Sequence, residues 1–380
     1  MKPTLRVTEL KLQNFRNYQA AELRTDNSIV VLSGANGAGK TNILEAISLL
    51  TPGRGLRRTQ LAECAKQNGP GSWAVAAKIN LGGDEISIGT GLSSVNDDDG
   101  AQRDVRINGM NAKKSSDLSD YVSALWLTPE NDGLFRGTAG ERRRFLDRMT
   151  MALDPAHNTR VNTLEKLLRS RNRLLADPDH DASWLDAIER ELSEAAIAVS
   201  AARMAQIDSL MQSIDEHHDT SSPFPFAIIN LEGEIEDLLR EHTSVEAEDA
   251  YRRILRQMRS ADAHSGRTTR GSHLSDMCVQ HGPKDMAAEL ASTGEQKALL
   301  VGLILAQTRH VVRTRGTAPL LLLDEIAAHL DSLRRAALYD ELERVGAQAW
   351  LTGTDSGMFS TLSGRAVFIE VANGTLQIAA

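Results

Sequence analysis

Residues 34–41 read Gly34-Ala35-Asn36-Gly37-Ala38-Gly39-Lys40-Thr41 and satisfy the pattern G-x-x-x-x-G-K-[ST]. A short apolar run at 28–32 precedes this stretch, and an amphipathic helix is predicted for 40–50. Glycines in such a loop let backbone N–H groups surround phosphates, and the N-terminus of the following helix adds positive potential. We therefore predict a phosphate-binding loop (P-loop) in which Lys40 reaches the β- and γ-phosphates and Thr41 binds Mg²⁺.

A second motif stands near the other end of the chain, where residues 320–325 read Leu320-Leu321-Leu322-Leu323-Asp324-Glu325. The apolar run predicts a buried parallel strand that carries two acids at its carboxyl end. Asp324 is then placed to hold Mg²⁺ directly or through water, and Glu325 to polarise a water for attack on the γ-phosphate. Such a strand alone is common in structural roles, but together with a P-loop it favours a nucleotide-hydrolysing site.

Most of the chain lies between these motifs, whereas compact P-loop GTPases and kinases place them much closer together. Helical patterns at 142–151, 161–175 and 184–214 indicate that the inserted segment is largely helical. It is also rich in arginine, because residues 136–173 hold ten basic residues against four acidic ones. Two interpretations stay open: a solvated helix face with ion pairs four residues apart, or contacts to nucleic-acid phosphates.

The composition excludes several classes of protein. The 380 residues carry a net charge of −8, which argues against a histone-like or polybasic membrane protein. Two cysteines rule out a disulfide scaffold and fit a reducing compartment. The first residues lack an apolar signal segment, and the longest apolar stretches are too short to span a bilayer. We therefore expect a soluble cytoplasmic protein with no membrane partner.

A third motif precedes the acidic strand. Residues 292–297 read Ser292-Thr293-Gly294-Glu295-Gln296-Lys297 and come directly before an apolar helix predicted at 298–311. In this order the segment resembles the signature motif of ABC-type ATPases, which binds the γ-phosphate of ATP held by a partner subunit. Asp331 stands where those ATPases have their D-loop. Thr354, in the segment 352–355, stands near their switch residue, which is usually a histidine and is missing here.

Nearly the whole chain resembles the RecF family of bacterial recombination mediators, which have an SMC-like ATPase head. The matching segments are Leu12–Tyr18, Gly37–Ile47, Ile107–Gly109, Thr128–Glu130, Glu141–Asp147, Arg171–Leu175 and Thr352–Asp355. Two departures are Gly271-Ser272-His273-Leu274, where the family usually has Gly-Pro-His-Arg, and Gln296-Lys297, where many members have Gln-Arg.

This resemblance implies an α/β fold: a P-loop ABC-type ATPase head with a mixed sheet and an inserted helical lobe, without a long coiled coil. We expect residues 1–125 and 275–380 to form the ATPase lobe together, and residues 126–274 to form the arginine-rich lobe. The residues expected around ATP and Mg²⁺ are Arg16, Asn17, Gly34, Ala35, Asn36, Gly37, Ala38, Gly39, Lys40, Thr41, Asn42, Thr293, Gly294, Asp324, Glu325, Asp331 and Thr354.

The resemblance also implies a function. ATP is expected to be sandwiched between two subunits in an ATP-dependent homodimer that binds duplex and gapped DNA. RecO and RecR are the expected partners in bringing RecA onto gapped DNA, and slow, DNA-stimulated hydrolysis would release the dimer. The DNA-contact candidates are Arg142, Arg143, Arg144, Arg171 and Arg173. The first three have a competing interpretation as buried ion pairs between lobes.

Two other functions share the same motifs. One is the nucleotide-binding subunit of a membrane transporter, and the other is an SMC-like ATPase linked to a nuclease. The length of the insertion, its arginine content and the missing switch histidine argue against the transporter. No acidic cluster of nuclease type follows the head, which argues against the second.

Overall fold

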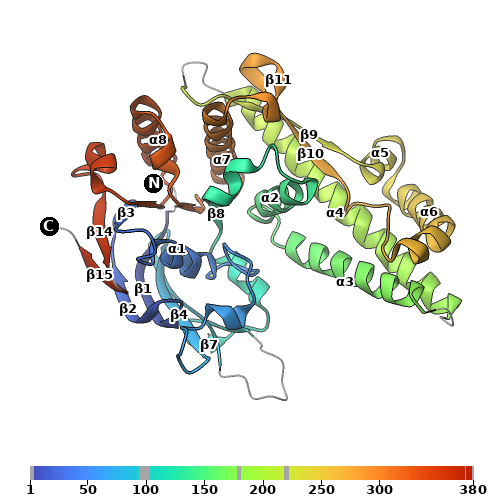
Figure 1. The fold of residues 1–380 in the computed structure, drawn as a ribbon, viewed down its shortest axis with the longest axis horizontal. Helices are drawn as coiled ribbons and strands as arrows, with labels where there is room; N and C mark the ends of the chain where they lie inside the picture. Colours follow the sequence, from blue (N-terminus) through green and yellow to red (C-terminus); the bar gives the residue numbers. More distant parts are fainter. Residues whose placement is uncertain (1–3, 94–102, 178–180, 218–221, 373, 379–380) are drawn as a thin grey trace. The chain divides into compact units, whose positions relative to one another are not determined.

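The computed structural model describes residues 4–93, 103–177, 181–217, 222–372 and 374–378 (Figure 1). The chain divides into two compact units. The first comprises residues 1–132, 219–225 and 292–380, and the second comprises residues 133–218 and 226–291. This division differs from the expected boundaries, because residues 126–132 and 219–225 belong to the first unit and residues 275–291 to the second.

The first unit is built on a six-stranded sheet in the order β15-β14-β3-β13-β12-β8. The bounds are β3 Ile29–Ser33, β8 Ala124–Leu127, β12 Leu320–Leu323, β13 Ala349–Gly353, β14 Val367–Ala372 and β15 Thr375–Ile378. All pairings are parallel except that of β14 with β15. The carboxyl ends of β3, β12 and β13 therefore meet at one edge of the sheet, where ligands bind in open α/β sheets.

Burial explains why these apolar runs form strands. Every residue of β12 is buried, as is the stretch from Ile29 to Leu32 in β3. The sequence prediction of a buried parallel strand at 320–323 is thus confirmed. Figure 1 shows α7 and α8 on one face of the sheet and α1 on the other. Their bounds are α1 Lys40–Ser48, α7 Thr293–Arg315 and α8 Ser332–Val345.

A second, antiparallel sheet in the first unit has the order β2-β1-β4-β5-β6-β7. The bounds are β1 Leu5–Phe15, β2 Tyr18–Arg24, β4 Trp73–Leu81, β5 Asp84–Leu92, β6 Arg103–Ile107 and β7 Met110–Asn111. Alternate residues of β4 are buried, and they join Ile43, Leu44 and Ile47 of α1 in one hydrophobic core. This packing holds the P-loop helix between the two sheets. The short helices of this region are η1 Leu61–Cys64, η2 Ser115–Asp120, η3 Pro129–Gly133, η6 Ile326–His329 and η7 Ser356–Leu362.

The second unit combines helices with a small sheet, so it is not purely helical. Its helices are α2 Ala139–Met151, α3 His157–Leu175, α4 Ala182–His217, α5 Glu234–Glu241 and α6 Ser244–Ser265. An antiparallel sheet in the order β11-β10-β9 joins β9 Ala227–Glu232, β10 Asp276–His281 and β11 Met286–Ala287, with η4 Gly282–Lys284 and η5 Ala288–Leu290 nearby. Apolar side chains of α3, α4, α5 and α6 form a hydrophobic core in this unit.

The longest helix among the described residues is α4, with 36 residues. That length corresponds to roughly 54 Å, which is far from the arms of a long coiled coil. Within the part of the chain that the structure describes, none of the helices is both long enough and apolar enough to cross a bilayer.

Candidate functional site

The P-loop runs from the end of β3 into α1. Gly39 caps α1 with a φ of 115°, a conformation that favours glycine because it has no Cβ. A Cβ there would also lie 2.5 Å from Nδ2 of Asn17 and 2.7 Å from the hydroxyl of Tyr18. The turn between β1 and β2 therefore packs against the loop and fixes its shape.

Lys40 lies inside this loop. Its side-chain Nζ donates to the carbonyl oxygens of Gly34, at 2.7 Å, and Ala35, at 2.9 Å. The residue is only 4% exposed. A charge-assisted hydrogen bond to an anionic phosphate oxygen is stronger than one to a neutral carbonyl, so the ammonium is held where a phosphate can recruit it.

The acidic strand meets the P-loop directly. The hydroxyl of Thr41 lies 3.0 and 2.9 Å from the two carboxylate oxygens of Asp324. Asp324 is buried, at 4% exposure, and follows β12 at the same sheet edge. A hydroxyl and a carboxylate are the hard oxygen donors that Mg²⁺ prefers, and this metal usually takes only one or two ligands from the protein.

Glu325 takes a strained backbone conformation. Its φ is 55°, in the left-handed region that non-glycine residues seldom occupy. The backbone N–H of Glu325 donates to the hydroxyl of Thr352 at 2.8 Å, and that hydroxyl lies 2.7 Å from Oδ1 of Asp324. Thr352 thus bridges the two acids and fixes the direction in which the chain leaves β12.

Arg16, Asn17 and Asn42 lie beside the P-loop. Nδ2 of Asn17 donates to the carbonyl of Ala38 at 2.9 Å, and Nδ2 of Asn42 donates to Oδ1 of Asn17 at 2.7 Å. All three residues line a groove of about 720 Å³. The head group of Arg16 is bound to the carboxylate of Glu45, at 2.8 and 2.6 Å.

Four other predicted residues lie apart from this cluster. Thr293 and Gly294 are exposed at the start of α7, where Ser292 and Glu295 form a capping box. Asp331 caps α8 by accepting from the backbone N–H of Arg334 at 2.8 Å, and Thr354 is exposed after β13. Within the described residues, none of these four forms a hydrogen bond with Lys40 or Asp324.

The segment Gly271–Leu274 lies between α6 and β10. A Gly-Pro pair stands closer to α7, at Gly282 and Pro283, where it forms the turn after β10. This pair is the better match to the Gly-Pro of the RecF-like pattern, so the departure expected at 271–274 is misplaced. The difference from Gly-Pro-His-Arg is then Lys284 and Asp285.

Two of the three consecutive arginines of α2 are held within the second unit. Arg142 forms two hydrogen bonds of 2.7 Å with the carboxylate of Asp276, and this contact holds the pKa of Asp276 below its usual range. Arg143 donates to the carbonyl of Ser275 at 2.5 Å. Arg144 is exposed. The ion-pair interpretation thus holds for Arg142, but the pair lies inside one unit and not between lobes.

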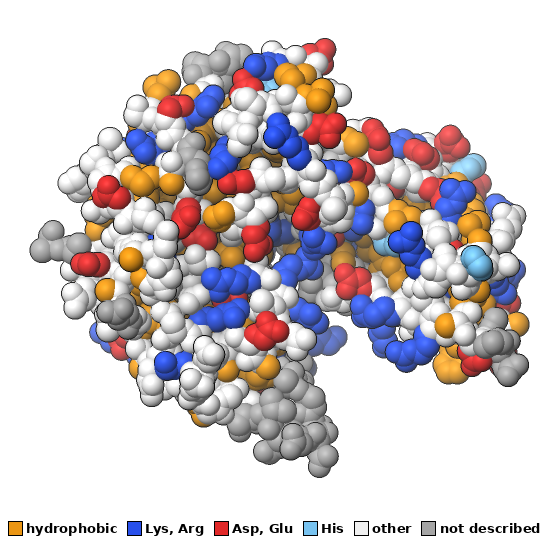
Figure 2. All heavy atoms as spheres, viewed as in Figure 1, with side chains coloured by type: hydrophobic (Ala, Val, Ile, Leu, Met, Phe, Trp, Pro, Cys, Tyr) orange, Lys and Arg blue, Asp and Glu red, His pale blue; other side chains and the backbone are white. Residues whose placement is uncertain are grey.

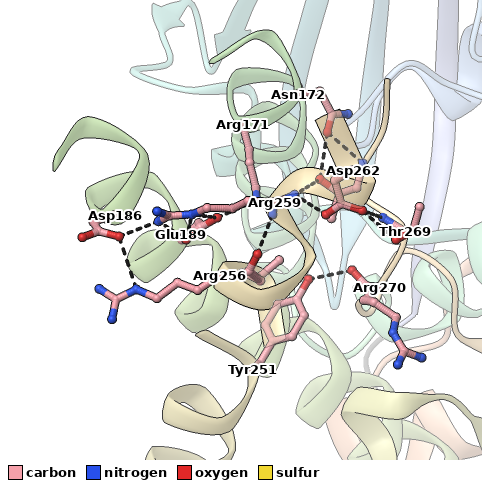
Figure 3. A network of polar contacts seen from close by, with 12 residues as sticks. Arg171, Asn172, Asp186, Glu189, Tyr251, Arg256, Arg259, Asp262, Thr269 and Arg270 are labelled. Carbon is pink, nitrogen blue, oxygen red and sulfur yellow. Dashed lines mark hydrogen bonds and ion pairs between the residues drawn. The ribbon is translucent and has the colours of Figure 1, made fainter. Parts of the chain in front are cut away.

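Arg171 is fully buried, which overturns its prediction as a DNA contact. Figure 3 shows its polar contacts with Glu189 and Asp262. Its guanidinium binds Glu189 at 3.0 Å, Asp262 at 2.7 Å, the hydroxyl of Thr268 at 2.9 Å and the carbonyl of Leu255 at 2.8 Å. These partners belong to α4, α6 and the segment after α6. Arg171 therefore ties α3 to its neighbours and cannot reach a phosphate, whereas Arg173 is exposed.

Comparison with known proteins identifies the family. The family model for the RecF/RecN/SMC N terminal domain matches residues 6–376. The chain is 48% identical over 370 residues to the DNA replication and repair protein RecF of Mesorhizobium japonicum, which covers 97% of each chain. The chain belongs to the RecF family.

Solved structures agree on the fold. The recombination mediator protein RecF-ATPrS in the RecFOR pathway is 20% identical, with a TM-score of 0.85 over 99% of this chain and 98% of that one. An Smc head domain with an extended coiled coil, from Pyrococcus furiosus, is 17% identical, with a TM-score of 0.53 over 99% of this chain and 96% of that one. The RecF-family chain therefore has the P-loop ATPase head fold, as the sequence predicts.

Sequence reasoning missed two residues of this site. Thr352 follows the apolar run 349–351 and lies at the sheet edge that the P-loop and Asp324 share. A polar residue directly after a predicted strand was the sign in the sequence that could have identified it. Glu45 is 1% exposed and pairs with both Arg16 and Arg57. Glu45 is the one acidic residue of α1, and nothing in the sequence indicated that it pairs with these arginines.

Replacing Thr352 with valine will impair the RecF-family site. The change leaves the N–H of Glu325 without its acceptor and removes one donor from Asp324. A lost buried hydrogen bond costs about 1–3 kcal/mol, so we expect a lower melting temperature together with slower ATP hydrolysis. Thr352→Ser keeps the hydroxyl and should behave as wild type. Thr361→Val, at an exposed position of the same unit, is the matched control, and an equal loss in both valine variants would contradict the bridging role.

Replacing Arg171 with methionine will destabilise the second unit. The change leaves the buried carboxylates of Glu189 and Asp262 without this cation, and breaking a buried pair costs about 3–5 kcal/mol. Chemical denaturation followed by circular dichroism measures the effect. Arg173→Met, two residues away on the exposed face, should change stability by no more than about 0.5 kcal/mol. Equal stability of the two variants would show that the buried network is not needed.

Proposed function

We propose that this RecF-family protein binds ATP and Mg²⁺ between its P-loop and Asp324 and uses ATP to control its binding to DNA. The observation that carries the proposal is the contact of 3.0 and 2.9 Å between Thr41 and Asp324. The P-loop and the acidic strand, which are far apart in the sequence, are in contact there through polar side chains. The near full-length relatives are RecF proteins of DNA replication and repair, which favours this function over a transporter or nuclease subunit.

Each residue of the site has a distinct role in the proposed hydrolysis of ATP. Backbone N–H groups of residues 34–39 and the N-terminus of α1 surround the phosphates, and Lys40 exchanges its carbonyl partners for phosphate oxygens. Thr41 and Asp324 hold Mg²⁺, which neutralises charge that develops on the phosphates when it is bound. Glu325 accepts a proton from the attacking water. The groove beside Arg16, Asn17 and Asn42 leaves room for the nucleoside.

A second copy of the chain completes the site in this proposal. Thr293 and Gly294 are exposed at a helix N-terminus, where backbone N–H groups favour an anion. Asp331 and Thr354 are exposed as well. We propose that these residues meet the γ-phosphate held by the partner, so that ATP binding drives dimerisation and hydrolysis reverses it.

The ATP-bound dimer is proposed to bind duplex DNA near single-stranded gaps. Slow, DNA-stimulated hydrolysis then acts as a switch and releases the DNA. The family resemblance supports RecO and RecR as partners and RecA as the protein that they load, in the bacterial cytoplasm. The relatives named as DNA replication and repair proteins support this role.

Fluorescence anisotropy of a labelled gapped duplex tests the proposed function. The titration is made with ATP, with ADP and without nucleotide, at about 50 and 200 mM salt, because phosphate contacts weaken steeply over that range. We expect tight DNA binding only in the presence of ATP, and we expect this binding to be weaker at the higher salt concentration. Absence of binding in all three states would contradict DNA binding by this protein on its own.

A further inference from the structure

We propose that the second unit contacts the DNA phosphates through a basic row on α3, formed by Lys166, Arg169 and Arg173, together with Arg267 across a groove. This inference rests on the proposed DNA-binding function and names the surface that performs it. From the sequence, Arg173 is a named candidate, and Lys166 and Arg169 belong to the basic segment 136–173 for which phosphate contacts stay open. Arg267 lies outside that segment.

Many of the basic residues in the segment 136–173 already bind other groups of the second unit. Between residues 136 and 173, Arg136 binds the carbonyls of Glu289 and Ala291. Arg142 and Arg143 bind β10 and the residue before it, and Arg160 pairs with Asp154. With Arg171 buried, these cations stabilise the fold and are not available to a ligand.

Residues 252–270 form a second segment rich in arginine, which is largely neutralised by acidic residues of α4 and α6. On α6, Arg252 pairs with Asp249, and Arg256 and Arg259 both pair with Asp186. Arg259 also binds Glu189 at 2.6 Å. Most of the charge of α6 is therefore neutralised inside the second unit, in contrast to the outer face of α3.

Lys166, Arg169 and Arg173 are exposed on the outer face of α3. Their spacing of three and four residues places them on one side of the helix, and Leu164, Leu167 and Arg171 are buried on the other. Lys166 and Arg173 form no ion pair within the described residues. Arg169 has only a loose pair with Glu165, at 3.7 Å between two exposed side chains. Figure 2 shows lysine and arginine side chains gathered along the edge where Figure 1 draws α3.

A groove beside this row brings in the fourth cation. The groove has a volume of about 440 Å³, and its lining includes Arg169 and Asn172 from α3 and Arg267 from the segment after α6. Among the described residues, Glu165 is the single acid in its lining. Two arginines against one carboxylate give the groove a positive charge that suits a phosphate and not an acidic surface.

The buried network holds the two walls of this groove together. Oδ1 of Asn172 accepts from the backbone N–H and the hydroxyl of Thr268, both at 2.8 Å, and Arg171 also binds Thr268. Asp262 accepts from the hydroxyl of Thr269 at 2.6 Å. The backbones that carry Arg169 and Arg267 are thus fixed before a ligand arrives, which lowers the ordering cost of binding.

A charge-matched pair of triple variants tests the proposal. The row variant is Lys166→Gln, Arg169→Gln and Arg173→Gln. The control is Arg240→Gln, Arg252→Gln and Arg256→Gln, which removes the same charge from the same unit at partly exposed arginines that already have acidic partners. Both variants are titrated with the labelled gapped duplex in ATP at several salt concentrations, and their ATP affinity and melting temperature are measured.

The expected result is a decrease in DNA affinity of about tenfold or more in the row variant. Its slope of log K against log salt should also become shallower by roughly 0.9 for each phosphate that the row no longer neutralises. The control should change affinity by less than about threefold, and Arg267→Gln alone should give an intermediate decrease. Equal affinities and slopes in the row variant and the control would overturn the proposed surface while wild-type binding still supports the DNA function. A wild-type protein that binds no DNA would overturn both.

Discussion

Lys40→Met will abolish ATP binding. The ammonium of Lys40 is held in the interior of the P-loop, bound to the carbonyls of Gly34 and Ala35. Hydrogen bonds that involve a charged group contribute about 1.5–3 kcal/mol each, so removing two of them to phosphate lowers affinity by roughly 10²- to 10⁴-fold. Methionine fills similar space without the charge. Isothermal titration calorimetry with ATP and Mg²⁺ measures the decrease.

Lys78→Met is the matched control for this change. Lys78 pairs with Glu85 at 3.0 Å on an antiparallel strand of the first unit, and both side chains are partly exposed. It should bind ATP as wild type does. A Lys40→Met protein that is folded and still binds ATP with wild-type affinity would show that the P-loop is not the nucleotide site.

Glu325→Gln will stop turnover while leaving ATP binding intact. The amide keeps the shape of the side chain, and the backbone N–H remains bound to Thr352, so the strained turn after β12 is preserved. The change removes the proton acceptor, and a positioned general base contributes about 10²- to 10⁴-fold to a rate. Phosphate release in the steady state should fall by that factor, with ATP affinity within about threefold of wild type.

Asp324→Asn should behave differently from Glu325→Gln. Asp324 contacts Thr41 at the proposed metal position, so its replacement should weaken the dependence of ATP binding on Mg²⁺ as well as turnover. A Glu325→Gln protein that hydrolyses ATP at the wild-type rate would remove Glu325 from the proposed role as base. It would leave Asp324 and the P-loop in place as the binding site.

The nucleotide motifs could be read from the sequence because their chemistry is local. The glycines and Lys40 of the P-loop follow directly from the residue pattern, and the four leucines before Asp324 are a buried parallel strand as predicted. That the two motifs touch depends on a shared sheet edge. The rule that carboxyl ends of parallel strands meet there was enough to predict it.

The roles of the arginines could not be read in the same way, because burial and ion pairs depend on partners far away in the sequence. Arg142 forms an ion pair with Asp276, and Arg171 forms ion pairs with Glu189 and Asp262. One signal was available for Arg171: it follows Leu164 and Leu167 at helical spacing, on the apolar face of α3. Strands β9 and β10 of the second unit likewise form through pairing between distant segments, which no local pattern reveals.

The most direct test of the composite ATP site is the molar mass of the protein in solution by light scattering. The chain has a mass of 41.4 kDa. Wild type, Lys40→Met and Gly294→Glu are measured with ATP and Mg²⁺, with ADP, and without nucleotide; the added carboxylate of Gly294→Glu would repel a partner's γ-phosphate. We predict a mass near twice that of one chain for wild type with ATP alone, and the mass of one chain for both variants in every state. A Gly294→Glu protein that dimerises with ATP, or a wild-type mass that ATP does not change, would contradict it.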